Sequence, residues 1–176
     1  PTFEAMSLLG LSLSAIGNHE LDEGPDEILR LSEGGRCHDE GCSPMGAPAA
    51  PSFELLAANT FTTGVGGETL FTPYVIRELG GARVAFIGIT LEGTPAIAPG
   101  AASLDFGDEA DTVNALVPEI RAMGVEAIVV LMHEGGGQLG GPNACTRIAG
   151  AVLDIVERMD PAVDVVITGH THQAYV

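Results

Sequence analysis

The 176-residue sequence predicts an α/β fold, and three observations support that prediction. Segments with helical periodicity alternate with short apolar segments that are typical of strands. Two of the apolar segments, around residues 129 and 166, are continuously hydrophobic, as expected of strands covered on both faces. Hydrophobic residues make up 45% of the chain, which is enough to form one domain with its own core.

The first part of the chain is expected to alternate between helix and strand. Residues 3–10 resemble the end of a helix, and residues 12–16 a short strand. A helix should run from Pro25 to about Leu31, because proline suits a first helical position and acidic residues follow it. A loop over residues 34–52 then leads to a buried strand at 55–59.

The second part begins with a predicted hairpin, in which strands 73–79 and 82–90 are joined by Gly80 and Gly81. An irregular loop is expected at 91–103. The remaining elements should be a helix at 108–123 that ends before Gly124, a strand at 126–132, a glycine-rich loop at 135–141, a helix at 148–159 and a last strand at 163–168.

Charge and hydropathy exclude some classes of function. The formal net charge is −17, with 24 acidic and seven basic residues. Such a surface argues against nucleic-acid binding, which needs basic groups to neutralise phosphates, so no nucleic-acid partner is expected. No apolar run reaches the ~18 residues of a membrane span, so none is predicted.

Two of the three cysteines, Cys37 and Cys42, lie close together in a loop rich in glycine, proline and alanine. One interpretation is a small disulfide loop, which would place the protein in an oxidising compartment. The other is a metal clip that uses Cys and His, although structural zinc usually has four ligands at regular spacing. The disulfide is favoured, and Cys145 is then a free thiol or has a partner outside the chain.

The histidines gather at strand ends. Four of the five histidines follow three apolar segments, and these four are His19, His133, His170 and His172. Asn18 lies directly before His19. Alternate residues of an extended strand point the same way, so His170 and His172 are expected to face one side. The carboxyl ends of strands are where open α/β sheets place their sites. Scattered core or surface histidines would rarely be distributed in this way.

Histidine and asparagine ligands, with carboxylates nearby, suit divalent Mn, Fe, Co or Zn. A metal at these strand ends could polarise a phosphoryl oxygen and lower the pKa of a bound water to ~7. Two metals ~3.5–4 Å apart could hold both the entering and the leaving oxygens of an in-line displacement. The pattern therefore indicates metal-assisted hydrolysis.

Several segments together resemble the calcineurin-like metallophosphoesterases, and in particular the secreted bacterial 5′-nucleotidases. The segments are residues 17–24, Leu56-Ala57-Ala58-Asn59, residues 86–95, His133-Glu134-Gly135-Gly136 and residues 169–175. Their order and spacing both fit, whereas a lone Gly-Asn-His would be a weak signal. The resemblance implies two β-sheets flanked by helices.

The resemblance also implies roles for individual residues. Asn18, His133 and His170 would bind one divalent metal, and His172 the other. His19 would face the scissile phosphate, stabilise developing charge and help the leaving oxygen. Glu20 would orient a neighbouring group. His38 is expected to be a simple loop residue, and Asp22 and Asp39 to be solvated.

Two features of the family do not occur in this sequence. Its Asp-x-His and Gly-Asp segments, which supply a bridging carboxylate and most ligands of the first metal, should precede Gly17 and are absent from residues 1–16. Its C-terminal nucleotide-binding domain would lie beyond Val176. Residues 1–176 are therefore expected to be a partial catalytic domain that lacks its first strands, with core faces or edges exposed.

The resulting functional prediction distinguishes the chain from its parent. The parent is expected to be a secreted, periplasmic or cell-surface 5′-nucleotidase that uses two divalent metal ions (Mn, Zn, Co or Fe) on a nucleotide or another phosphoester. A cyclic-nucleotide phosphodiesterase or a sugar-nucleotide hydrolase of the same superfamily is the alternative. The isolated chain is expected to have little or no activity, and an inert metal-binding fragment is the non-catalytic alternative.

Overall fold

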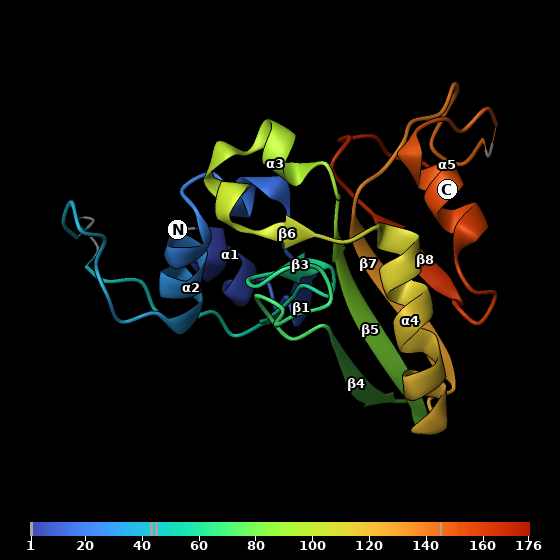
Figure 1. Cartoon of the computed structure of the whole chain (residues 1–176), viewed down its shortest axis with the longest axis horizontal. Coiled ribbons are helices and arrows are strands. Elements are labelled where there is room, and N and C mark those ends of the chain that lie inside the picture. Colours follow the sequence, from blue (N-terminus) through green and yellow to red (C-terminus); the bar gives the residue numbers. More distant parts are fainter. Residues whose placement is uncertain (1, 43, 45, 145) are drawn as a thin grey trace.

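A computed structural model describes residues 2–42, 44, 46–144 and 146–176, and it has a mixed α/β architecture (Figure 1). The described residues form one four-stranded sheet and two two-stranded sheets. The strands are β1 (Leu13–Ala15), β2 (Glu54–Leu56), β3 (Thr60–Phe61), β4 (Tyr74–Leu79), β5 (Ala82–Thr90), β6 (Asp105–Phe106), β7 (Ala127–His133) and β8 (Val165–Thr168). The helices are α1 (Thr2–Leu8), η1 (Asn18–Leu21), α2 (Pro25–Glu33), α3 (Thr94–Ile97), η2 (Pro99–Ser103), α4 (Glu109–Ala122) and α5 (Ala151–Arg158).

The four-stranded sheet has the strand order β4-β5-β7-β8. Strands β4 and β5 form the predicted antiparallel hairpin, and Gly80 and Gly81 both adopt the positive φ that its tight turn requires. Strands β5, β7 and β8 are parallel, with Thr90 opposite His133 and Met132 opposite Thr168. The carboxyl ends of all three parallel strands therefore lie at the same end of the sheet.

Helices α4 and α5 lie beside this sheet, as Figure 1 shows, and cover one of its faces. The buried side chains of β7 alternate along the strand, which is the pattern of a strand with one face in a core. The core on this face joins the sheet to both helices and includes Ile128, Val130, Met132, Val113, Val117, Ile120, Val152 and Ile155.

A second core lies among β1, β2, η1 and α2, and it includes Ile16, Leu21, Ile28 and Leu55. Strand β1 also contacts β5 and β7, so the β1–β2 pair is stacked on the other face of the four-stranded sheet. The buried Asn59 joins the elements through its side-chain amide, which donates to the carbonyls of Thr90 and Gly107 at 2.6 and 2.9 Å. The Thr90 hydroxyl donates to the Ile16 carbonyl at 2.8 Å and so links the two cores.

The elements predicted from the sequence are confirmed, but their bounds and the intervening loops differ in places. The segment 91–103, expected to be irregular, contains the short helices α3 and η2, each with a proline in its first turn. Elements this short contain barely one turn, so they show no periodicity that could predict them. The two-residue strands β3 and β6 pair with each other and were not predicted either.

Apolar side chains remain exposed along β8, which is an edge strand of the four-stranded sheet. Val165 is 47% exposed and Ile167 56%, and Leu153 and Val156 of α5 are also exposed. They line a groove of about 850 Å³. The expectation that the apolar segment around residue 166 is a strand covered on both faces is therefore wrong, because side chains of β8 stay exposed. Exposure caused by missing first strands stays a prediction, since β8 is the last strand of this sheet in chain order.

Among the residues that the structure describes, none of the helices is both long and apolar enough to span a membrane.

Candidate metal centre

Three of the predicted ligands meet at one point. The Oδ1 atom of Asn18 lies 2.9 Å from Nε2 of His133 and 3.1 Å from Nδ1 of His170. The two imidazole rings are edge-to-face, with centroids 5.2 Å apart. Asn18 is only 3% exposed, and both histidines are half-buried. The cluster therefore joins side chains that are far apart in the sequence, in a place partly shielded from solvent.

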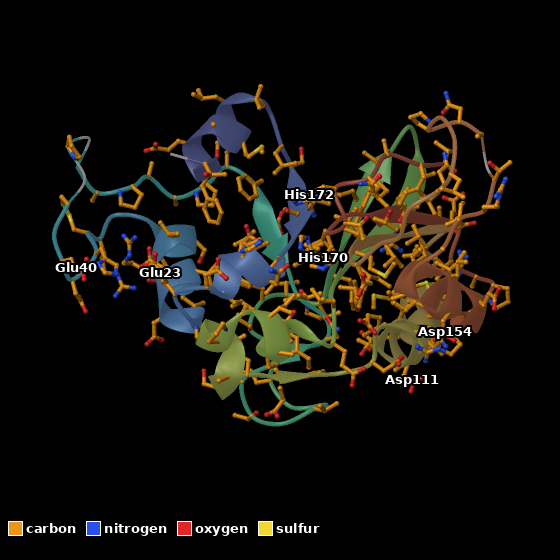
Figure 2. All side chains as sticks on the ribbon, turned by 90° about the horizontal axis from the view of Figure 1, so that it is seen from above. Glu23, Glu40, Asp111, Asp154, His170 and His172 are labelled. Carbon is orange, nitrogen blue, oxygen red and sulfur yellow. A yellow bond between two sulfur atoms is a disulfide. The ribbon has the colours of Figure 1, made fainter. Side chains whose placement is uncertain are left out.

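The topology explains this convergence. His133 is the last residue of β7, and His170 follows the end of the adjacent parallel strand β8 by two residues. Asn18 begins η1, three residues after the end of β1, and β1 contacts β5 and β7. Figure 2 shows His170 between the N-terminal elements and the four-stranded sheet.

Gly17 provides the space that the His133 ring occupies. A Cβ atom at position 17 would lie 2.6–2.7 Å from three atoms of this imidazole, closer than real Cβ contacts allow. The Gly17 N–H donates to Oε2 of Glu20 at 2.7 Å. Glu20 thus holds the backbone immediately before Asn18, a contact in keeping with the orienting role expected of it.

The loop after β8 has an unusual backbone conformation. His170 and His172 both have positive φ angles, 62° and 54°. The expectation that they would alternate along an extended strand is wrong, because β8 ends at Thr168 and the two histidines lie in a left-handed turn. His172 is exposed, and Figure 2 shows it in the same region of the molecule as His170.

His19 has a carboxylate partner. Its Nδ1 atom lies 2.8 Å from Oδ2 of Asp22, and its side chain is 75% exposed. The hydrogen bond that the imidazole donates to Asp22, followed by the negative charge of this carboxylate, raises the pKa of His19. The expectation that Asp22 is merely solvated is therefore wrong. The i, i+3 spacing could have indicated the contact, because it aligns side chains in a 3₁₀ turn.

The donor atoms of the cluster suit a divalent metal. Burial lowers the pKa of His133, and the charge of His170 lowers it further, which favours the neutral imidazole that binds metals. Donors that bind at ~2.1 Å lie ~3 Å apart in an octahedral arrangement and ~3.4 Å apart in a tetrahedral one. The separations within the cluster, 2.9 and 3.1 Å, match the octahedral spacing. Asn18, His133 and His170 therefore fit a metal of the borderline class.

Among the residues that the structure describes, two other groups of side chains lie close enough for a cation, but each group has a carboxylate that is bound within the protein. In the group Glu23, Glu27 and His38, both Glu27 oxygens accept from Arg30 at 2.6 Å. In the group Glu92, Asp108 and Glu109, Arg158 binds Asp108, and the Glu92 N–H donates to Glu109. Neither group is a better candidate than the cluster at the strand ends.

Cys37 and Cys42 form a disulfide bond, with Cα atoms 4.8 Å apart. The predicted pairing is confirmed, and the alternative of a metal clip that uses these cysteines is wrong because both sulfurs are bonded. His38 lies within this small loop, and its Nε2 atom is 3.7 Å from Glu23 Oε2, so it is not an isolated loop residue. Cys145, which is expected to be a free thiol or to have a partner outside the chain, is not among the described residues.

Known proteins resemble the chain along nearly its whole length, although no protein-family model matches it. It is 36% identical to Endonuclease YhcR of Bacillus subtilis, 34% identical to Cell wall protein Lmo0130 of Listeria monocytogenes and 28% identical to a 5′-nucleotidase of Vibrio cholerae. Each comparison covers 98% of this chain. The chain spans only 14%, 24% and 28% of the length of these relatives.

Solved structures show the same similarity of fold. The crystal structure of the calcineurin-like phosphoesterase YfkN of B. subtilis superposes with a TM-score of 0.72 at 24% identity, over 98% of this chain and 48% of that one. The 5′-nucleotidase precursor of Thermus thermophilus superposes with a TM-score of 0.71 at 27% identity, over 97% of this chain and 28% of that one. The predicted partial sandwich of the metallophosphoesterases is thereby confirmed.

Proposed function

We propose that this chain, whose homologues and structural neighbours are calcineurin-like phosphoesterases and 5′-nucleotidases along its whole length, is part of a metal-dependent phosphoester hydrolase. The observation that carries the proposal is the convergence of Asn18, His133 and His170 on one point at the carboxyl ends of parallel strands. Within that class we infer a 5′-nucleotidase that acts on nucleotides. Related proteins of cell walls and venoms support export to the cell surface or beyond.

In the proposed site, Asn18, His133 and His170 hold one divalent ion, and His172 contributes to a second. The ions supply polarisation of a phosphoryl oxygen and a water of lowered pKa. His19, exposed beside the cluster and held by Asp22, donates a proton to the leaving oxygen. Its raised pKa keeps more of it protonated near neutral pH, which is the form an acid needs.

The isolated chain is proposed to bind one ion and to hydrolyse little substrate. Asn18, His133 and His170 supply three ligands, whereas His172 alone would hold a second ion weakly. A longer polypeptide that contains this chain should supply the remaining ligands and the part of the protein that positions the substrate. Activity is therefore expected of the longer protein after Mn²⁺, Co²⁺ or Zn²⁺ is added.

Metal titration of residues 1–176 by calorimetry tests the ligand set. We expect one Zn²⁺ or Co²⁺ to bind per chain. N18A, H133A or H170A should each weaken metal binding by more than about 100-fold, because residues that only contact the ligands of a metal contribute up to about 100-fold. H19A and H38A should bind the ion as the wild type does. Equal affinity in H38A and H133A would contradict the proposed ligands.

Substrate assays test the reaction in the longer protein. AMP, a cyclic nucleotide, a sugar nucleotide and duplex DNA should be compared at equal metal concentration. We expect AMP to be turned over fastest and H19A to reduce that turnover. Faster cleavage of DNA would favour an endonuclease, the activity for which one relative is named, and would contradict both the nucleotidase assignment and the expected lack of a nucleic-acid partner.

A further inference from the structure

The hydroxyl of Tyr175 contacts both segments that carry the clustered histidines. It lies 2.7 Å from Oγ1 of Thr168, and it accepts from the N–H of Gly136 at 3.1 Å. Thr168 precedes His170 by two residues, and Gly136 follows His133 by three. One oxygen atom thus links the two loops at the ends of β7 and β8.

Two further hydrogen bonds hold the same two loops together. The Thr171 hydroxyl donates to the Gly136 carbonyl at 2.6 Å, and the Gly169 N–H donates to the Glu134 carbonyl at 3.2 Å. A Cβ atom at Gly135 would lie 2.4 Å from the Gly169 carbonyl oxygen, so the chains are as close as glycine permits. A small movement of either loop would therefore be transmitted to the other.

The backbone of the second loop is under strain. His170 and His172 hold positive φ angles without being glycine. Such conformations are unfavourable for residues other than glycine and persist only where the surroundings fix them. Contacts on either side of His170 come from Thr168, Thr171 and Tyr175, so these three hydroxyls are among the groups that hold this segment, together with the backbone bond of Gly169.

We propose that Tyr175 is a positioning residue of the metal centre, whose hydroxyl fixes the His170 loop against the His133 loop so that both imidazoles face Asn18. The proposal rests on the proposed metal site and adds a residue beyond the ligands. The Tyr175 ring also packs against the core between the four-stranded sheet and helices α4 and α5. If Tyr175 only filled that core, phenylalanine could replace it without effect on the histidines.

The chain provides a matched control, because its only other tyrosine is also bound through its hydroxyl. Tyr74 lies in β4, the edge strand opposite β8, and packs against the same core. Its Oη atom lies 2.6 Å from Oε1 of Glu119. Y175F and Y74F each remove one hydroxyl and keep the ring, so they should change stability similarly. They should affect the histidine cluster differently.

The first measurement uses the metal-free chain, with nitrogen-detected NMR of the imidazoles. We expect the signals of His133 and His170 to shift in Y175F and to stay in place in Y74F. T168V, which removes the partner hydroxyl, should reproduce the shift and serves if Y175F does not fold. Unchanged imidazole signals in both Y175F and T168V would overturn the proposal.

The second measurement is calorimetric titration with Zn²⁺ alone. We expect Y175F to bind about 10-fold more weakly than Y74F, the lower end of the effect of outer partners on metal affinity. Wild-type affinity in Y175F would overturn the positioning role. If the wild-type chain binds no Zn²⁺, the proposed metal site fails, whereas the imidazole signals still decide the role of Tyr175.

Discussion

At the scale of single residues, the contact between His19 and Asp22 makes a direct prediction. The hydrogen bond and the charge of Asp22 raise the pKa of His19. D22N removes the charge and weakens the bond, so we expect the pKa of His19 to fall toward the ordinary value of ~6.5. An NMR pH titration of the imidazole measures it. D39N, which changes another exposed aspartate, should leave it unchanged, and equal values in D22N and wild type would contradict the pairing.

The sequence predicted which residues would meet, but not how they are held. The apolar segments before Asn18, His133 and His170 placed these residues after strand ends. Parallel pairing of β7 with β8 brings the two histidines together, and the contacts of β1 with β5 and β7 bring Asn18 to them. Their roles as metal ligands, and that of His172, stay predictions. The left-handed turn at His170 could not be foreseen, because local propensity disfavours it and long-range contacts impose it.

At the scale of elements, Asp108 connects two helices. Its Oδ1 atom accepts from the Asp111 N–H at 2.9 Å and so caps the N-terminus of α4. Both of its oxygens also accept from Arg158 of α5, at 2.9 and 2.8 Å. We expect D108A to lower the free energy of unfolding by about 1–2 kcal/mol, as the loss of a cap does, and D108N to lower it less because its amide oxygen still caps.

The difference in the free energy of unfolding between wild type and D108A should depend on pH, in the direction set by the pKa shift of Asp108. The hydrogen bond from Arg158 lowers the pKa of Asp108 in the folded chain. A carboxyl group with a lowered folded pKa stabilises the protein above its unfolded pKa, and this contribution is lost as the pH falls through the folded value. Urea titrations should therefore show that the free energies of unfolding of wild type and D108A become more alike in acid. A difference between these free energies that grows in acid would contradict the ion pair.

Elements were predictable in proportion to their length. Helix α4 and strand β7 are long enough to show a clear period, and both were found close to their predicted bounds. Helix α3 spans only Thr94–Ile97, and β3 and β6 have two residues each. Such short elements are fixed by packing and capping rather than by a pattern that the sequence displays.

At the scale of the whole molecule, the apolar groove along β8 and α5 should bind a hydrophobic dye. Its walls include Val165 and Ile167, both exposed on an edge strand. We expect I167K to weaken the binding of anilinonaphthalene sulfonate several-fold with little effect on stability, because this side chain is already 56% exposed. L9K introduces the same charge at an exposed leucine outside the groove, and equal dye binding in the two variants would contradict this assignment.

The position of Asn18 affects the order in which the protein assembles. Asn18 stands beside the core that contains Ile16 and Leu21, whereas His133 and His170 belong to the sheet of the other core. The contacts between them span 115 and 152 residues, so they require both cores to be in place. A folding intermediate with one core formed has no complete site. An ion present at a free concentration of 100 times its dissociation constant would stabilise by about 2.7 kcal/mol only those states in which both cores are packed together, and would thereby strengthen the coupling between them.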